Sequence, residues 1–236
     1  MNDEQLWTFL LAPCYASFGQ KGIDKLTELL TEKKLKPISK KIWFEVLPLP
    51  PRAEEGNTNL YLAVGQIDNR KDYKSGIKLS EKENKWICFC EMKWNSDIST
   101  NVTHDSYRNQ LIRVIENALT FQNNKGEYAE NVFVTLVTPK KYMLDDRNGI
   151  KTKLYHYKYL EYKNKINIEK ELEACQMKYY KNYGWSYPKN IAERINNLTL
   201  NHKSYDELFN HLKMFKNSNL SEKIIEFWKL YGVNKN

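Results

Sequence analysis

The chain has few of the residues and runs on which metal-binding and membrane-spanning proteins depend. Only four of its 236 residues are cysteine, and no two of them form a Cys-x-x-Cys pair. Cys88 and Cys90 point the same way on a predicted strand, which is more typical of core packing than of metal binding, so no zinc site is expected. No stretch approaches about 18 apolar residues, the length that a transmembrane helix requires. The acidic start is also a poor signal peptide, so we expect a cytoplasmic protein.

Positive charge is concentrated in the last third of the sequence. Residues 151–236 hold 16 Lys and Arg against 9 Asp and Glu, whereas residues 1–150 hold 21 against 20. Ten of the sixteen tyrosines also lie in the last third. Such a segment suits nucleic acid, because cations contact phosphates and rings stack on bases, although a solvated Lys-rich surface is the alternative. The candidate nucleic-acid contacts are Lys178, Lys181 and Lys189 in this third, together with Arg108 and Arg113, which precede it.

Hydrophobic periodicity predicts an α/β domain within residues 1–145. Apolar residues at helical spacing predict helices at 20–34 and 107–121. Strands are predicted at 40–50, 59–67 and 85–94, and a nearly continuous run of β-formers at 131–139 predicts a strand buried on both faces. The order is α-β-β-β-α-β, which indicates a mixed sheet flanked by helices.

The rest of the sequence predicts a second part of the chain that is mainly helical. Residues 146–236 are expected to form a basic, Tyr-rich and mainly helical extension packed on the core. Its predicted helices cover 167–183, 188–198, 204–215 and 219–232. Ser204 followed by Glu207 is a capping-box pattern, which marks the start of the third of these helices. Residues 68–84 are polar and predict a loop or a ragged hairpin end.

The third predicted strand has an unusual end. Its alternation places Ile87, Phe89, Glu91 and Lys93 on one face, with apolar residues on the other. A carboxylate and an ammonium among apolar residues cost free energy unless each has a partner. The simpler alternative is that the strand ends at residue 90 and both charges lie in water. The apolar pattern continues to Trp94, however, which favours a strand that includes the two charges.

The stretch "CEMKW" together with the element order resembles the PD-(D/E)xK nuclease superfamily, the restriction-endonuclease-like fold. The resemblance covers residues from about 20 to about 140. It implies that Glu91 is a metal ligand, that the main-chain carbonyl of Met92 is another, and that Lys93 orients or activates the attacking water. Gln110 on the following helix matches a glutamine that some branches place near the site, although a solvent-facing position is an equal alternative.

The resemblance implies a Mg²⁺- or Mn²⁺-dependent deoxyribonuclease of the restriction or phage-defence type. Carboxylate-bound Mg²⁺ suits this chemistry because it supplies a bound water and neutralises charge at the phosphate. A homodimer is implied for cutting both strands. Two alternatives stay open: a non-catalytic nucleic-acid-binding or regulatory module on the same fold, and a protein-interaction domain that uses the Tyr-rich region.

The family also places an aspartate on the second strand, and this sequence departs from that pattern. If the second and third strands pair around a turn near residue 76, Glu91 lies opposite Tyr61 and Lys93 lies opposite Asn59. Asn59 is therefore the candidate for the aspartate position, with an oxygen but no charge for a metal. Glu54 or Glu55 could complete the site instead, and Asn59 could be natural or an inactivating substitution.

Overall fold

The structure is a computed structural model, and it describes residues 3–37, 41–82, 85–97, 108–143, 153–181, 184–215 and 219–233. A five-stranded mixed sheet lies at its centre, in the order β1-β2-β5-β6-β7. These strands are β1 (Trp43–Val46), β2 (Leu60–Gly65), β5 (Trp86–Met92), β6 (Asn131–Thr138) and β7 (Leu198–Ser204). The first three are antiparallel and the last three are parallel.

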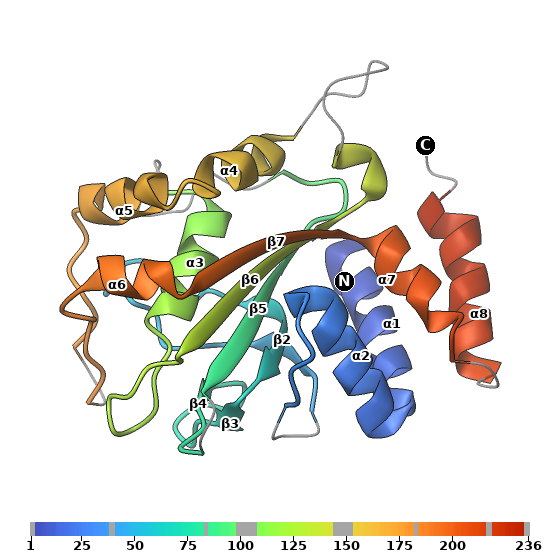
Figure 1. The fold of residues 1–236 in the computed structure, drawn as a ribbon, viewed down its shortest axis with the longest axis horizontal. Coiled ribbons are helices and arrows are strands. Elements are labelled where there is room, and N and C mark those ends of the chain that lie inside the picture. Colours follow the sequence, from blue (N-terminus) through green and yellow to red (C-terminus); the bar gives the residue numbers. More distant parts are fainter. Residues whose placement is uncertain are drawn as a thin grey trace.

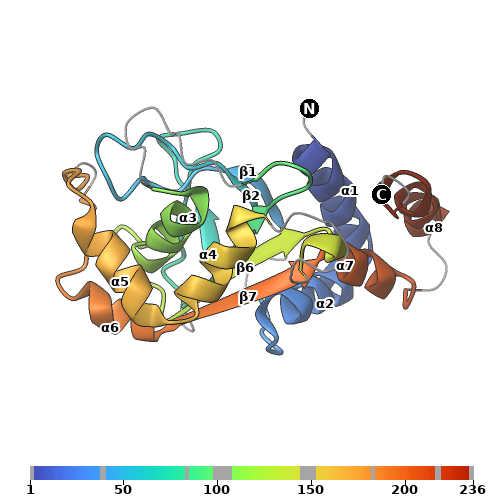
Figure 2. The same cartoon turned by 90° about the horizontal axis from the view of Figure 1, so that it is seen from above.

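Helices cover both faces of this sheet (Figures 1 and 2). On one face lie α1 (Asp3–Ser17), α2 (Gly19–Thr31), α7 (Tyr205–Leu212), α8 (Asn219–Phe227) and a π-helical turn (Trp228–Val233). On the other lie α3 (Gln110–Leu119), α4 (Leu154–Tyr162), α5 (Lys165–Ala174) and α6 (Ile191–Asn196). A short 3₁₀ turn covers Lys140–Tyr142. Within the described ranges, no helix combines the length and the apolar character needed to cross a bilayer.

The predicted α/β class is confirmed, and β5 alternates as its sequence indicates. Cys88, Cys90 and Met92 pack into the core beside α1 and α2, whereas Ile87 and Phe89 pack into the core beside α3. The strand β6 is buried from Val132 onward, in keeping with its run of β-formers. The α3 helix begins after Asn109, whose side chain accepts a hydrogen bond from the Ile112 amide at 3.0 Å.

The last third contributes more than a helical extension. Its strand β7, which the sequence analysis did not predict, pairs with β6 along seven residues and completes the sheet. The expected boundary at 145/146 itself lies outside the described residues, but the two sides of it share one sheet and both cores. The predicted cap at Ser204 is confirmed, since its hydroxyl accepts the Glu207 amide at 3.0 Å.

Two other predicted segments differ in detail. Residues 67–79 form a hairpin of β3 (Ile67–Asn69) and β4 (Ile77–Leu79), which was one of the two alternatives for this stretch. The helix predicted at 167–183 ends at Ala174. Beyond it, main-chain groups pair with the segment before β2: the Ala53 amide donates to the Lys178 carbonyl at 2.9 Å, and Tyr180 donates to Pro51 at 3.0 Å. These tertiary hydrogen bonds replace the helical ones.

Candidate functional site

Glu91 is the next-to-last residue of β5, and Lys93 directly follows the strand and contacts Gln110 in the first turn of α3. The register of β2 and β5 pairs Leu62 with Cys90. Continued by one and three residues, this antiparallel register sets Tyr61 opposite Glu91 and Asn59 opposite Lys93. That arrangement agrees with the pairing expected from the sequence.

A polar cavity of ≈ 240 Å³ lies at this point. Strand β5 contributes Glu91 to its lining, and α3 contributes Gln110 and Arg113. The segment that leads into β2 contributes Asn59 and Tyr61. Gln5, Asn57, Thr58 and Val114 complete the lining. Residues from four separate parts of the chain therefore surround one small volume.

The two charges of the β5 motif are buried and paired with each other. Glu91 is 2 % exposed and Lys93 is 4 % exposed, so the alternative of a strand edge in water is wrong. Lys93 Nζ lies 3.3 Å from Glu91 Oε1 and donates to Gln110 Oε1 at 2.5 Å. Burial raises the pKa of Glu91, and the nearby charges of Lys93 and Arg113 oppose that shift. Gln110 therefore contacts the motif rather than solvent alone.

Asn59 has a partner that the sequence analysis did not identify. Its amide nitrogen donates to Glu45 Oε2, from the middle of β1. Glu45 has a φ of 50°, in the left-handed region that residues other than glycine rarely adopt. Its second carboxylate oxygen, Oε1, is buried without a hydrogen bond. A carboxylate thus lies beside Asn59, but it comes from β1 rather than from Glu54 or Glu55.

A second unexpected carboxylate comes from the first turn of α1. Glu4 is 6 % exposed, and its Oε1 accepts hydrogen bonds from the Trp94 amide at 3.2 Å and from the Ser96 hydroxyl. Burial acts to raise the pKa of Glu4, but these hydrogen bonds and the Lys93 charge outweigh it and lower that pKa. Glu4 therefore fixes the chain directly after the motif. The sequence signal was the acidic pair that opens an apolar helical run.

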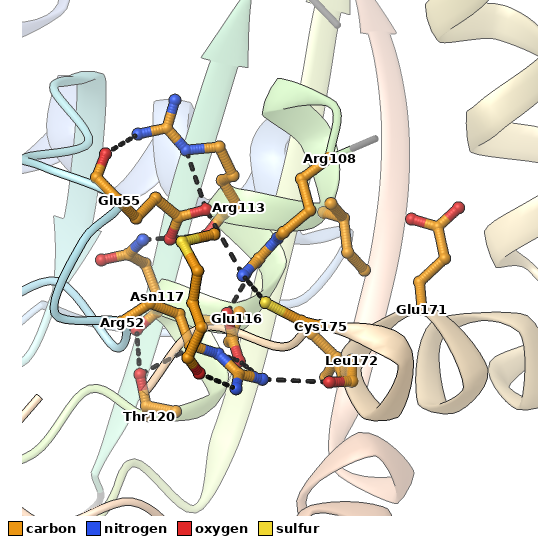
Figure 3. A network of polar contacts seen from close by, with 12 residues as sticks. Arg52, Glu55, Arg108, Arg113, Glu116, Asn117, Thr120, Glu171, Leu172 and Cys175 are labelled. Carbon is orange, nitrogen blue, oxygen red and sulfur yellow. Dashed lines mark hydrogen bonds and ion pairs between the residues drawn. The ribbon is translucent and has the colours of Figure 1, made fainter. Parts of the chain in front are cut away.

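Arg108, Arg113 and Glu55 belong to a buried ionic network (Figure 3). The Glu55 carboxylate lies 3.4 Å from Arg108 Nη1 and 3.1 Å from Arg113 Nε. Because its carboxylate already pairs with two guanidinium groups, Glu55 is a weaker candidate for the second metal ligand than Asn59. Arg108 is 4 % exposed, so the expectation that it contacts DNA directly needs correction. Arg113 is also buried, yet it lines the cavity beside Glu91.

Glu116 is the centre of this network. Its carboxylate accepts hydrogen bonds from Arg52 Nε at 2.9 Å, Arg108 Nη2 at 2.6 Å and the Tyr187 hydroxyl at 2.8 Å. Arg52 also donates to the carbonyls of Leu172 and Met177, at 3.0 Å and 3.1 Å. The network therefore fastens the segment after α5 to the middle of α3. Neither Arg52 nor Glu116 is predicted to be buried from the sequence. Glu116 belongs to a helix pattern, in which a charged residue ordinarily indicates an exposed face, and Arg52 follows a predicted strand in the irregular segment between β1 and β2.

The predicted lysine contacts lie on the surface. Lys178, Lys181 and Lys189 are all exposed, in the irregular segment that follows α5. Their exposure is compatible with phosphate contacts. Met92 is different, because its side chain is fully buried in the core and only its carbonyl could face a ligand. That role stays a prediction.

The cavity offers oxygen donors of the kind that Mg²⁺ prefers, in the Glu91 carboxylate, the Asn59 amide and the Tyr61 hydroxyl. One or two carboxylates, with waters and substrate phosphates, suffice for many Mg²⁺ sites. Lys93 and Arg113 place positive charge beside the single carboxylate of the lining. The donor set therefore offers a dication three oxygen-bearing side chains but a single negative charge. Among the described residues, no three His, Cys, Asp or Glu side chains converge on a common metal position.

Comparison of the chain with protein-family models, with curated proteins and with solved structures found no match in any of the three.

Proposed function

We propose that this chain is a metal-dependent deoxyribonuclease of the PD-(D/E)xK type. The observation that supports this most is that Glu91 and Gln110 line one polar cavity and that Lys93 contacts both of them. The motif lies at the end of a central strand, and the glutamine lies in the first turn of the helix that follows. When the β3–β4 hairpin is set aside, the order α2-β1-β2-β5-α3-β6 with a parallel β5–β6 pair also supports a restriction-endonuclease-like core.

Each residue then has a role in phosphodiester hydrolysis. Glu91, Asn59 and the Met92 carbonyl would hold Mg²⁺ or Mn²⁺, which supplies an activated water and charge neutralisation at the phosphate. Lys93 donates hydrogen bonds and so orients the attacking water, while Glu91 and Gln110 fix its ammonium. Arg113 lines the same cavity and is the candidate for binding a phosphate oxygen.

A second candidate is a non-catalytic DNA-binding or regulatory module on the same fold. The observation that favours it is the charge of the site, in which one carboxylate lies beside two cations. Mg²⁺ binds weakly where anionic ligands are few. We therefore expect slow cleavage at best in the unchanged protein. If it cuts both strands, two copies of the chain would each supply one site.

Cleavage is tested by nicking of supercoiled plasmid with and without Mg²⁺. In the Asn59→Asp protein, whose second carboxylate should make cleavage measurable, Lys93→Ala should lower the nicking rate by about 100-fold or more, the usual contribution of a group that handles the proton or the water. Lys125→Ala is the matched control, since this lysine is 65 % exposed and lies away from the cavity. Equal rates for the two variants would reject the nuclease and leave the binding module.

DNA binding should weaken steeply as salt concentration rises. Each lysine–phosphate contact releases a counterion, so each contact adds about one to the slope of log affinity against log salt. The triple variant Lys178→Ala, Lys181→Ala, Lys189→Ala should reduce that slope by about two to three. Fluorescence anisotropy at several salt concentrations gives the DNA affinities from which this slope is obtained. A slope that is unchanged in the variant would show that DNA contacts another surface.

A further inference from the structure

Four aromatic rings gather in the irregular segment that follows α5. The rings of Tyr179 and Tyr187 are stacked, with centroids 3.9 Å apart and an interplanar angle of 20°. Trp185 contacts both Tyr187 and Tyr180 edge to face, at 6.3 Å and 6.1 Å. Tyr187 and Trp185 are largely covered, whereas Tyr179 is 45 % exposed. The cluster therefore presents one large ring to solvent.

Two groups hold the exposed Tyr179 ring in place, the stacked ring of Tyr187 and the guanidinium of Arg52. The guanidinium carbon of Arg52 lies 4.5 Å from the Tyr179 centroid, and residues 52 and 179 form an antiparallel bridge. Arg52 is itself fixed by Glu116, which also binds the Tyr187 hydroxyl. An aromatic surface that is already ordered loses little side-chain entropy when a ligand stacks on it. Lys178 and Lys181 are exposed on either side of this ring in the sequence.

A cationic cavity of ≈ 480 Å³ adjoins the cluster, because Trp185 belongs to its lining. Arg70, Lys71 and Lys78 line it together with one carboxylate, that of Asp72. Asp72 Oδ1 lies 2.8 Å from Arg70 Nε, so the two lysines carry the excess positive charge. The cavity thus attracts an anion beside a set of aromatic rings.

The two cavities and the aromatic cluster all contact α3 or the residues that directly follow it. Gln110 and Arg113, near its start, line the Glu91 cavity, and Glu116 in its middle contacts Tyr187. Residues 122–124, which follow its end, line the cationic cavity. Ten helical residues span about 15 Å, so the two cavities lie near opposite ends of one short helix, and Glu116 between these ends contacts the aromatic cluster.

We propose that Tyr179, with Lys71 and Lys78 in the adjoining cavity, binds unpaired nucleotides of single-stranded nucleic acid. A base stacks on the exposed tyrosine ring, and a neighbouring phosphate binds the two lysines. Bases inside a duplex are already stacked on both faces, so this surface selects unpaired ones. The proposal rests on the proposed function in taking DNA as the partner, and it adds the strand form that the protein prefers.

The test is fluorescence anisotropy in EDTA, where metal-dependent cleavage does not occur. The probes are a labelled oligothymidylate of about 12 nucleotides, within the usual site sizes, and a duplex of the same length. The unchanged protein should bind the single strand more tightly. Tyr179→Ala should weaken that binding about tenfold or more, whereas Tyr179→Phe, which keeps the ring, should retain most of it. Tyr157→Ala, at a 54 % exposed tyrosine on α4, is the matched control.

The double variant Lys71→Ala, Lys78→Ala provides an independent arm that leaves the aromatic cluster unaltered. It should weaken single-strand binding and lower its salt dependence. Equal affinities for Tyr179→Ala and Tyr157→Ala, or a duplex bound as tightly as the single strand, would overturn the proposal. The binding assay does not measure cleavage, so the two proposals can fail separately. If the plasmid is not nicked but single-strand binding still depends on the Tyr179 ring, only the nuclease proposal is rejected.

Discussion

Replacing Glu116 by glutamine should destabilise the protein by about 3–5 kcal/mol, the usual cost of breaking a buried ion pair by removing one partner. The Glu116 carboxylate is fully buried and compensates two guanidinium groups, those of Arg52 and Arg108, which are 2 % and 4 % exposed. The neutral amide removes the counter-charge from Arg52 and leaves Arg108 with Glu55 alone. In a chain of this size, the loss should lower the melting temperature by roughly 10 °C.

Glu127→Gln provides the matched control for this prediction. Glu127 pairs with Lys85 at 2.7 Å, the same separation as Arg52 and Glu116, but its side chain is 46 % exposed. Solvent screens such a pair, so the melting temperature should change little. Thermal unfolding followed by circular dichroism compares the two variants. A similar small change in both would mean that the network in Figure 3 does not hold α3 to the segment after α5.

Replacing Asn59 by aspartate should raise Mg²⁺-dependent cleavage by an order of magnitude or more, because the cavity gains a second anionic ligand for a hard dication. The structure also predicts how the substitution changes the melting temperature. Asn59 now donates a hydrogen bond to Glu45, and an aspartate would instead repel that carboxylate. The variant should therefore melt below the unchanged protein in EDTA and gain more in melting temperature from Mg²⁺.

Other variants distinguish between Asn59 and Glu55 as the position of the second metal ligand. Asn59→Asp combined with Lys93→Ala should keep the Mg²⁺ stabilisation but lose the cleavage. If Glu55 is the ligand instead, Asn59→Asp should change little and Glu55→Gln should abolish cutting. Glu54→Gln is the control for the latter, because Glu54 is exposed whereas Glu55 is buried. Nicking rates across a Mg²⁺ titration distinguish these cases, and rates insensitive to residues 55 and 59 alike would place the site elsewhere.

Local patterns in the sequence predict the sheet well where strands are neighbours in the chain. The alternation of β5 and the turn near Gly76 are enough to place Tyr61 and Asn59 opposite Glu91 and Lys93. Strand periodicity determines which residues share a face, and hairpin pairing determines which residues lie across from them. The convergence of Glu91, Lys93 and Asn59 is therefore predictable from these two local rules alone.

Features that depend on distant partners are not predictable in this way. Glu4 approaches the motif because α1 packs beside the end of β5, and Glu45, which contacts Asn59, has a left-handed backbone that its sequence context does not indicate. A local pattern places Arg108 on the surface because its ionic partners, Glu55 and Glu116, come from segments that the pattern does not relate to it. In each case the partner, rather than the residue itself, determines whether a charge is exposed or buried.

The parallel pairing of β6 with β7 has a consequence for synthesis of the chain on the ribosome. When β6 emerges, its neighbour β5 is already available, but β7 is separated from it by about sixty residues that have yet to be translated. Until then, one edge of an apolar strand remains unpaired, and such edges recruit other chains. Completion of the sheet must wait until residues 198–204 are available, so the nascent chain depends on protection of this edge during that interval.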